Sequence, residues 1–148
     1  EVAHQWWGVI TGSDGFYQPW QDEALCEYAC LDYMGDVYGA SIRESESYYR
    51  IEAALNVTVP RGVTPGSPIS YFADLTEYSY VVYQRGAALW IALETFMGKD
   101  ALDALLLDYQ QQYRFRIASR EDLTELINRH AGQDMSGLIT DYLDTYMQ

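Results

Sequence analysis

Glu1, His4 and Glu23 combine the side-chain types and spacing that metal-dependent hydrolysis requires. Glu1 and His4 form the pattern E-x-x-H, and in a helix this spacing puts both side chains on one face, about one turn apart. Histidine nitrogens and carboxylate oxygens bind zinc, and a neighbouring carboxylate can take a proton from water. Glu23 follows His4 after 18 intervening residues and could supply a ligand from the next helix. E-x-x-H alone is a weak signal, because it occurs on many helices.

Each of these residues also has an ordinary structural interpretation. His4 could be a packed core histidine, and Glu23 lies near the start of an expected helix, where the helix dipole favours a carboxylate. Glu1 could be an exposed residue at the beginning of the chain. The spacing alone therefore leaves both a metal site and a plain helix surface open.

Longer segments carry a resemblance that the short pattern lacks. The sequence reads A-H-Q-W-W-G around His4 and, after the 18-residue gap, W-x-D-E-A-L-x-E-Y around Glu23. Residues 83–87 read Y-Q-R-G-A and open a long apolar helix. Together these segments resemble the aminopeptidase N and leukotriene-hydrolase family of gluzincin zinc metallopeptidases. Residues 122–143 are similar to the last helices of that family's peptidase domain, and only residues 41–75 match loosely.

The resemblance assigns roles to individual residues. It implies that His4 and Glu23 are zinc ligands and that Glu1 is the general base for a zinc-activated water that hydrolyses a peptide bond. Tyr83 would donate a hydrogen bond to the oxyanion, although the presence of 14 tyrosines keeps a packing role open. Glu27, one turn after Glu23, could orient a zinc-bound histidine or could be a solvated surface acid. No residue is expected to bind another cofactor.

The resemblance also sets limits on this chain. Because the chain begins at Glu1, it lacks the leading histidine of H-E-x-x-H and the family's upstream M-E-N segment, which holds a substrate's free amine. We expect that an N-terminal part is absent, that zinc belongs to the parent enzyme, and that this chain alone is metal-free and inactive. Exopeptidase and endopeptidase action both stay open, as does a non-catalytic scaffold or protein-interaction module derived from the same fold. A surface exposed by the truncation could support self-association.

Composition narrows the classes of protein and partner. The chain has 148 residues, 49% of them apolar, which favours one globular domain spanning residues 1–148. Acidic residues outnumber Lys and Arg by 22 to 9, and the net charge of −13 disfavours nucleic acid as a partner. Apolar runs such as residues 87–93 are far shorter than the roughly 20 residues that cross a bilayer. Cys26 and Cys30 are expected to be free thiols, because positions four apart in a helix are poorly oriented for a disulfide, and they leave the cellular compartment undetermined.

The elements that must position these residues are predicted to be helices. Apolar spacing and chain breakers predict a mainly α fold of about six to seven helices, which the resemblance makes the helical subdomain of a thermolysin-like zinc peptidase catalytic domain. The expected helices cover residues 1–10, 19–34, 41–54, 79–97, 101–114, 120–131 and 134–146. A loop rich in proline and glycine is expected over residues 57–73, and no strand is expected. The expected caps are Ser41 with Glu44, Asp100, Ser119 and Asp134 at helix starts, and Gly98 and Gly132 at helix ends.

Overall fold

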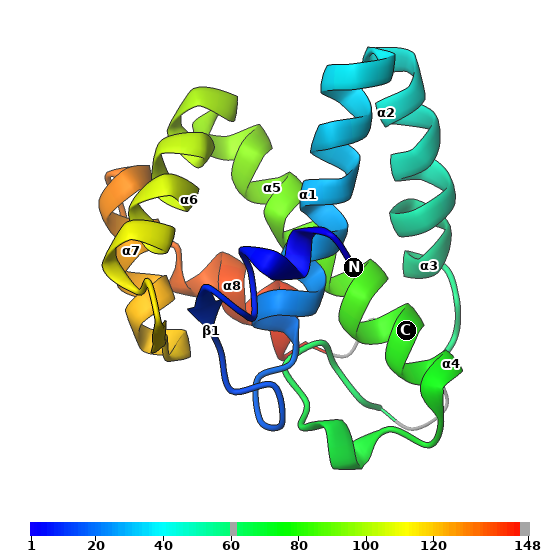
Figure 1. Ribbon diagram of the computed structural model, residues 1–148. Coiled ribbons are helices and arrows are strands. Elements are labelled where there is room, and N and C mark those ends of the chain that lie inside the picture. The colour runs from blue at the N-terminus through cyan, green and yellow to red at the C-terminus, as the bar shows by residue number, and fades with distance from the viewer. Residues whose placement is uncertain (60–61, 146–148) are drawn as a thin grey trace.

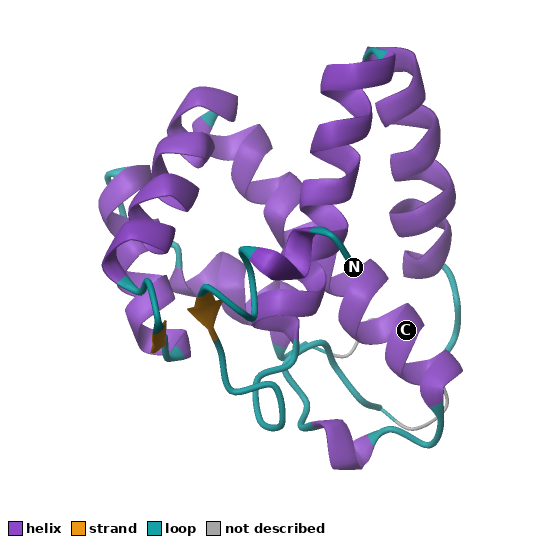
Figure 2. Ribbon diagram, viewed as in Figure 1, coloured by secondary structure: helices purple, strands orange, loops and turns teal. Residues whose placement is uncertain are grey.

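Helices dominate the computed structural model, which describes residues 1–59 and 62–145 (Figures 1 and 2). In chain order the α-helices are α1 (Trp20–Tyr38), α2 (Ala40–Ser47), α3 (Ala53–Leu55), α4 (Leu75–Tyr78), α5 (Gly86–Met97), α6 (Lys99–Gln112), α7 (Arg120–Ala131) and α8 (Ser136–Leu143). Short 3-10 turns form η1 (Ala3–Gln5) and η3 (Ile69–Tyr71), and π-helical turns form η2 (Tyr48–Glu52) and η4 (Ser79–Arg85). Two short strands complete the set, β1 (Thr11–Gly12) and β2 (Arg116–Ile117).

Several of these elements join into longer helices. α2, η2 and α3 run without a break, and so do α4, η4 and α5. Gly39 at φ 94° separates α1 from α2, and Gly98 at φ 85° separates α5 from α6, because this left-handed backbone region cannot continue a helix. The described residues thus contain 6 continuous helices, which confirms the predicted mainly α fold.

The core forms around α1 and α5. α1 packs against α2, α5 and η4, while α5 also packs against α6 and α8, so α6 and α7 lie on one side of this pair and the α2 to α3 helix on the other (Figure 1). Apart from Arg85, the largest fully buried side chains are aromatic, namely Trp20, Trp90, Tyr28 and Tyr109. Burial of such large apolar groups is the main source of stability for a helical layer of this kind.

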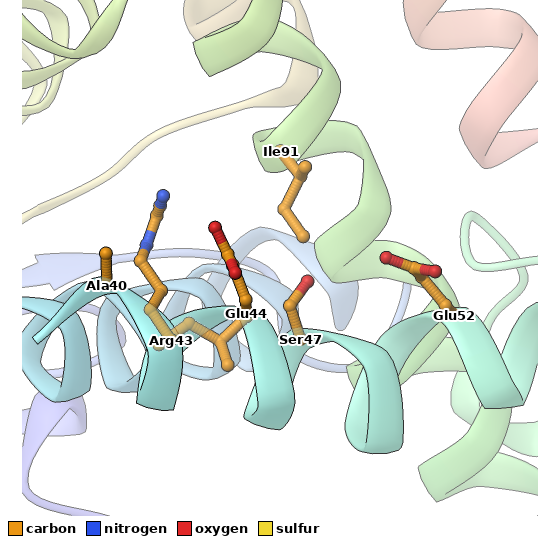
Figure 3. A pocket seen from close by; sticks show the side chains of 7 residues that line it. Ala40, Arg43, Glu44, Ser47, Glu52 and Ile91 are labelled. Carbon is orange, nitrogen blue, oxygen red and sulfur yellow. The ribbon is translucent and has the colours of Figure 1, made fainter.

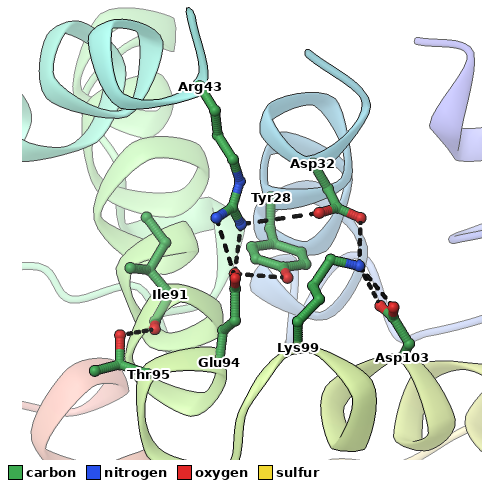
Figure 4. Close-up of polar contacts among 8 residues, drawn as sticks. All are labelled: Tyr28, Asp32, Arg43, Ile91, Glu94, Thr95, Lys99 and Asp103. Atoms are coloured by element: carbon green, nitrogen blue, oxygen red, sulfur yellow. Dashed lines mark hydrogen bonds and ion pairs between the residues drawn. The ribbon is translucent and has the colours of Figure 1, made fainter. Parts of the chain in front are cut away.

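A polar network ties four of these helices together (Figure 4). Arg43 of α2 donates from Nη1 to Oε1 of Glu94 in α5 over 3.0 Å, and also donates to Oε2. The Tyr28 hydroxyl of α1 donates to Oε2 of Glu94 over 2.9 Å. Nζ of Lys99 in α6 lies 3.0 Å from Oδ2 of Asp32 in α1. The network therefore fixes α2 and α6 against the central pair.

The predicted helix over residues 1–10 is wrong. Only Ala3–Gln5 form a 3-10 turn, and Gly8, at φ 100°, turns its backbone N–H to the Thr11 carbonyl over 2.7 Å. A run of seven residues before a glycine is too short to sustain an α-helix without strong packing.

None of the helices in the described part of the chain combines the length and the apolar character that a membrane span requires.

The prediction that the chain has no strand is also wrong. β1 and β2 form a parallel pair with Thr11 opposite Arg116 and Gly12 opposite Ile117. Strands of two residues show no alternation of apolar and polar side chains, so the periodicity of the sequence does not reveal them. The pair joins the segment before α1 to the segment before α7.

Some of the predicted helix boundaries and caps are confirmed, and others are wrong. Gly98 and Gly132 end α5 and α7 as expected, and Ser119 caps α7. Ser41 with Glu44, and Asp100, are wrong as caps, because α2 and α6 begin directly after Gly39 and Gly98 without a side-chain cap.

Three further helix boundaries differ from the expected ones. α1 extends four residues past the expected end at residue 34 and ends just before Gly39. Gly35 does not break the helix, and its missing side chain leaves room for Arg43 of α2, whose Cδ would lie 2.8 Å from a Cβ there. Asp134 accepts the Ser136 N–H over 2.9 Å at the start of α8. The expected end of the last helix, at residue 146, is wrong, because α8 ends at Leu143 and residues 144 and 145 are not helical.

Candidate metal centre and active site

The segment before α1 crosses the first turns of that helix and brings His4 to Glu23 (Figure 1). Nε2 of His4 and Oε2 of Glu23 lie 3.0 Å apart, with 24% and 18% of the two side chains exposed. The two residues that the resemblance makes zinc ligands therefore meet in one half-buried site.

The other ring nitrogen of His4 is held by the backbone. Nδ1 lies 3.2 Å from the Trp7 carbonyl oxygen, and because a carbonyl can only accept, Nδ1 is the donor and Nε2 is the atom directed at Glu23. A ring nitrogen that donates to a carbonyl in this way orients the imidazoles that bind metals. Gly8 leaves room for the side chains of His4 and Asp22. A Cβ at Gly8 would lie 3.4 Å from Nδ1 of His4 and 2.9 Å from Oδ2 of Asp22.

The carboxylate of Glu23 has one satisfied and one unsatisfied oxygen. Oε1 accepts a hydrogen bond from the Tyr78 hydroxyl over 3.4 Å. Oε2 is buried, and no donor among the described residues reaches it with hydrogen-bond geometry, although His4 Nε2 is 3.0 Å away. Two acceptor atoms this close need a proton or a cation between them. The donor set of one imidazole and one carboxylate fits zinc.

His4 and Glu23 supply only part of a metal site. Across residues 1–59 and 62–145, no group of three or more His, Cys, Asp or Glu side chains is placed to hold a metal ion. A catalytic zinc site uses three protein ligands and keeps one position open for water or substrate. The described residues therefore fit two of the three protein ligands of such a site.

Two tyrosines of the α4 to α5 helix face Glu23 from the other side. The rings of Tyr78 and Tyr83 meet edge to face, with their centroids 5.6 Å apart. Burial raises the pKa of Tyr83, and a hydrogen bond to Glu23 and the charge of Glu23 raise it further. Burial and the charge of Glu23 likewise raise the pKa of Tyr78. Both phenols therefore keep their protons and can donate hydrogen bonds.

Sequence reasoning missed Tyr78 and Asp22 as members of the site. Tyr78 precedes Tyr83 by five residues, and in an α-helix that spacing points to different faces, whereas the π-helical turn of η4 brings the two rings together. Asp22 has a raised pKa because of burial and then the charge of Glu23. Its one sequence signal was its position beside Glu23 in the W-x-D-E segment.

Glu1 and Glu27 lie at the edges of this arrangement. Glu1 is exposed and lines a cavity together with Trp7 and Cys26. Glu27 accepts a hydrogen bond from Nη1 of Arg50 over 3.1 Å. The structure thus pairs Glu27 with an arginine and does not bring it to His4.

One cavity lies beside the candidate site, and a smaller one lies apart from it. A cavity of about 620 Å³ adjoins the site, with Glu1, Trp6, Cys26 and Tyr33 in its wall. Burial, and then the charges of Asp22 and Glu23, raises the pKa of the Cys26 thiol to about 12, so this thiol stays protonated and unreactive. A smaller cavity of about 230 Å³ lies between α2 and α5, where Glu44, Ser47 and Ile91 line it (Figure 3). None of the predicted site residues lines the smaller cavity.

Sequence comparison relates the chain to known proteins. The peptidase family M1 domain matches residues 1–142. The chain is 21% identical over 148 residues to a probable aminopeptidase 1 from Sulfurisphaera tokodaii, covering 97% of this chain and 19% of that protein. It is 26% identical over 149 residues to aminopeptidase N from Lactobacillus helveticus, covering 97% of this chain and 17% of that protein. The chain thus spans about a fifth of the length of these relatives.

Solved structures show the same fold. An M1 zinc metallopeptidase variant from Deinococcus radiodurans superposes with a TM-score of 0.81 at 20% identity, over 99% of this chain and 32% of that one. Native yeast LTA4 hydrolase superposes with a TM-score of 0.78 at 17% identity, over 99% of this chain and 25% of that one. With its fold, its paired His4 and Glu23 and its match over residues 1–142, this chain belongs to peptidase family M1.

Proposed function

We propose that residues 1–148 form one domain, the helical part of the catalytic domain of a zinc-dependent, aminopeptidase-like metallopeptidase. The observation that carries this proposal is the contact between His4 and Glu23, with the buried Oε2 of Glu23 lacking a hydrogen-bond donor among the described residues. The fold and family of the chain support it. The substrate class is peptides, because the relatives that match over most of this chain are named as aminopeptidases.

Each site residue has a defined task in this proposal. His4 and Glu23 would hold a zinc ion, with the Trp7 carbonyl orienting His4 and the Tyr78 hydroxyl orienting Glu23. A bound zinc ion would act as a Lewis acid and lower the pKa of a coordinated water to about 7. Glu1 accepts a proton from the attacking water.

Tyr83 completes the arrangement from the opposite side. Its phenol stays protonated, because burial and Glu23 raise its pKa. It therefore donates a hydrogen bond to the substrate's carbonyl oxygen as negative charge develops there. Glu27 contributes through the first turns of α1, which it ties to Arg50 of η2.

We further propose that the 148-residue chain alone has no peptidase activity and does not retain zinc. Two ligands bind zinc far more weakly than three, and water would compete for every remaining position. The alternative to a zinc peptidase is a non-catalytic scaffold or protein-interaction module with the same fold. The residue that precedes Glu1 in a longer protein separates these two, because histidine would complete H-E-x-x-H and any other residue would favour the scaffold.

The decisive experiment compares this chain with a longer protein that includes residues before Glu1. Zinc content is measured by elemental analysis, and turnover is measured with amino-acid amides and with internally quenched peptides, which separate exopeptidase from endopeptidase action. In the longer protein, Glu1→Gln should lower turnover by about 1,000-fold or more and leave zinc bound, while His4→Ala should lose the zinc. Glu44→Gln, an exposed acid on α2, is the matched control and should change neither.

Several outcomes would contradict the proposal. Unchanged turnover in Glu1→Gln would remove its role as the general base. Stoichiometric zinc together with turnover in the 148-residue chain would overturn the inactivity of that chain. A longer protein without zinc and without hydrolysis would favour the scaffold.

A further inference from the structure

Arg85 is a buried arginine close to the site that the proposed mechanism does not use. Only 2% of it is exposed. Its Nε donates to the Ala54 carbonyl over 3.1 Å, and its Nη2 donates to the Val57 carbonyl. Ala54 lies in the last turn of α3 and Val57 just beyond it. A buried guanidinium is costly unless it is hydrogen-bonded, and the carbonyl end of a helix is a favourable place for a positive charge.

The hydrogen bonds of Arg85 also constrain Tyr83, because the two residues are two positions apart in the same turn. Both residues belong to η4, the π-helical turn Ser79–Arg85. π-helical turns are rare and less favourable than α-helical ones, so their surroundings must hold them in place. If η4 adopted α-helical geometry, side chains on one side of the turn would shift by one residue, a rotation of about 100°. Such a rotation would carry the Tyr83 ring away from the ring of Tyr78, 5.6 Å from it, whose hydroxyl donates to Glu23.

The next residue fixes the same turn to α1. A Cβ on Gly86 would lie 2.8 Å from Cβ of Ala24, the residue after Glu23. The lack of a side chain at Gly86 therefore allows the start of α5 to approach α1 beside the candidate ligand. Arg85 and Gly86 together hold the turn between α3 and α1, with Tyr83 two residues before Arg85.

We infer that Arg85 is a positioning residue for Tyr83: by fastening η4 to the carbonyl end of α3, it holds the Tyr83 ring beside Tyr78 and the Glu23 carboxylate. The inference deepens the proposed function, since a catalytic task for Tyr83 rests on that proposal. The placement of the Tyr83 ring beside Tyr78 and Glu23 can be measured without any peptidase activity. The two ideas can therefore fail separately.

The test uses ¹⁹F NMR of the 148-residue chain labelled with 3-fluorotyrosine. The Tyr83 resonance is identified by its loss in Tyr83→Phe, and its exposure is measured by broadening from a soluble paramagnetic agent. In Arg85→Met the resonance should move toward the shift of exposed fluorotyrosine and broaden at least twofold more. Arg85→Lys keeps the positive charge but replaces the several N–H donors of the guanidinium with a single ammonium group. Its Tyr83 resonance should lie between those of the wild type and Arg85→Met.

A matched control separates positioning from general loss of stability. Arg43→Met removes another inward-facing arginine, one that binds Glu94 next to Tyr28. It should lower stability while the Tyr83 resonance stays in place. An unmoved Tyr83 resonance in folded Arg85→Met would overturn the inference, and so would an equal movement in Arg43→Met. Loss of the folded state in both Arg85 variants would assign Arg85 to the whole fold and also overturn a role specific to Tyr83.

A longer protein with peptidase activity allows a second readout. Arg85→Lys should lower kcat by about tenfold or more with KM changed less than twofold, because a misplaced Tyr83 affects the transition state more than binding. The double variant with Tyr83→Phe should be no slower than Tyr83→Phe alone. Additive losses would contradict the inference. Absence of activity in the wild-type longer protein would count against the proposed function and leave the ¹⁹F result to decide the role of Arg85.

Discussion

His4, Glu23 and Tyr83 come from three segments of the chain and meet at one carboxylate. Oε2 of Glu23 lies 3.0 Å from Nε2 of His4, and Oε1 lies 3.4 Å from the Tyr78 hydroxyl. Burial, and then Glu23, raises the pKa of Tyr83. A buried oxygen without a donor is costly in a chain that has no other use for it. At the scale of single residues, the contact between His4 and Glu23 needs a shared proton or a cation, and a cation there is what the proposed function requires.

Glu94 shows the opposite arrangement, a carboxylate whose partners are all supplied by the chain. Burial would raise the pKa of Glu94, but hydrogen bonds from Arg43 and Tyr28 outweigh burial, and the net pKa is lowered. A carboxyl with a lowered pKa in the folded state stabilises the fold above its unfolded pKa of about 4.3, and this contribution is lost as the pH falls through the folded pKa.

We predict that Glu94→Gln lowers the free energy of unfolding by about 2 kcal/mol at pH 7 and by much less at pH 3. The measurement is urea unfolding followed by circular dichroism across this pH range. Glu44→Gln, an exposed acid that makes no ion pair among the described residues, is the control and should give a nearly constant difference. Equal losses for Glu94→Gln at both pH values would show that its charge does not stabilise the fold.

At the scale of elements, two serines with similar sequence contexts have different roles. Ser119 accepts the Asp122 N–H over 3.1 Å, and Asp122 accepts the Ser119 N–H over 2.8 Å, which makes a complete capping box. Ser41 and Glu44 have the same spacing, but α2 begins after Gly39 and has no side-chain cap. The entry of the chain into α2 is set by the turn at Gly39, so the sequence pattern there caps nothing.

We predict that Ser119→Ala lowers the free energy of unfolding by about 1 kcal/mol, whereas Ser41→Ala changes it by less than about 0.5 kcal/mol. Urea unfolding of both variants at neutral pH measures the difference. A larger loss in Ser41→Ala than in Ser119→Ala would mean that α2 begins at the serine.

At the scale of the whole molecule, a hydrophobic surface and a strong negative charge act against each other. Val2, Trp6 and Tyr33, exposed by 69%, 45% and 58%, surround the cavity beside Glu1. Apolar surface of this kind favours association. The net charge of −13 opposes it, because like charges repel across distances comparable to the Debye length.

We predict that this chain self-associates through the surface formed by Val2, Trp6 and Tyr33, and that salt strengthens the association. Light scattering should show a rising average mass between about 0.05 and 0.5 M salt, since screening removes the repulsion and leaves the apolar attraction. Trp6→Ser should reduce this rise, while Tyr71→Ser, which removes an exposed aromatic residue of η3, should not. A strict monomer at high concentration and high salt would exclude this prediction.

The sequence by itself determined the helical class, and it singled out His4 and Glu23, which the structure brings together. Helical periodicity and glycine breaks are local properties, so most helix spans and the ends at Gly98 and Gly132 could be read directly. The spacing of Glu1, His4 and Glu23, and the motif around Tyr83, likewise need no knowledge of distant contacts.

Only the tertiary structure decided how those residues are supported. The bond from Tyr78 to Glu23 spans 55 positions, and that from Arg85 to Ala54 spans 31. Glu27 pairs with Arg50 across 23 positions, and the strands β1 and β2 meet across more than 100 residues. These contacts depend on how helices pack side by side, and local propensity and periodicity carry no information about a partner that far along the chain.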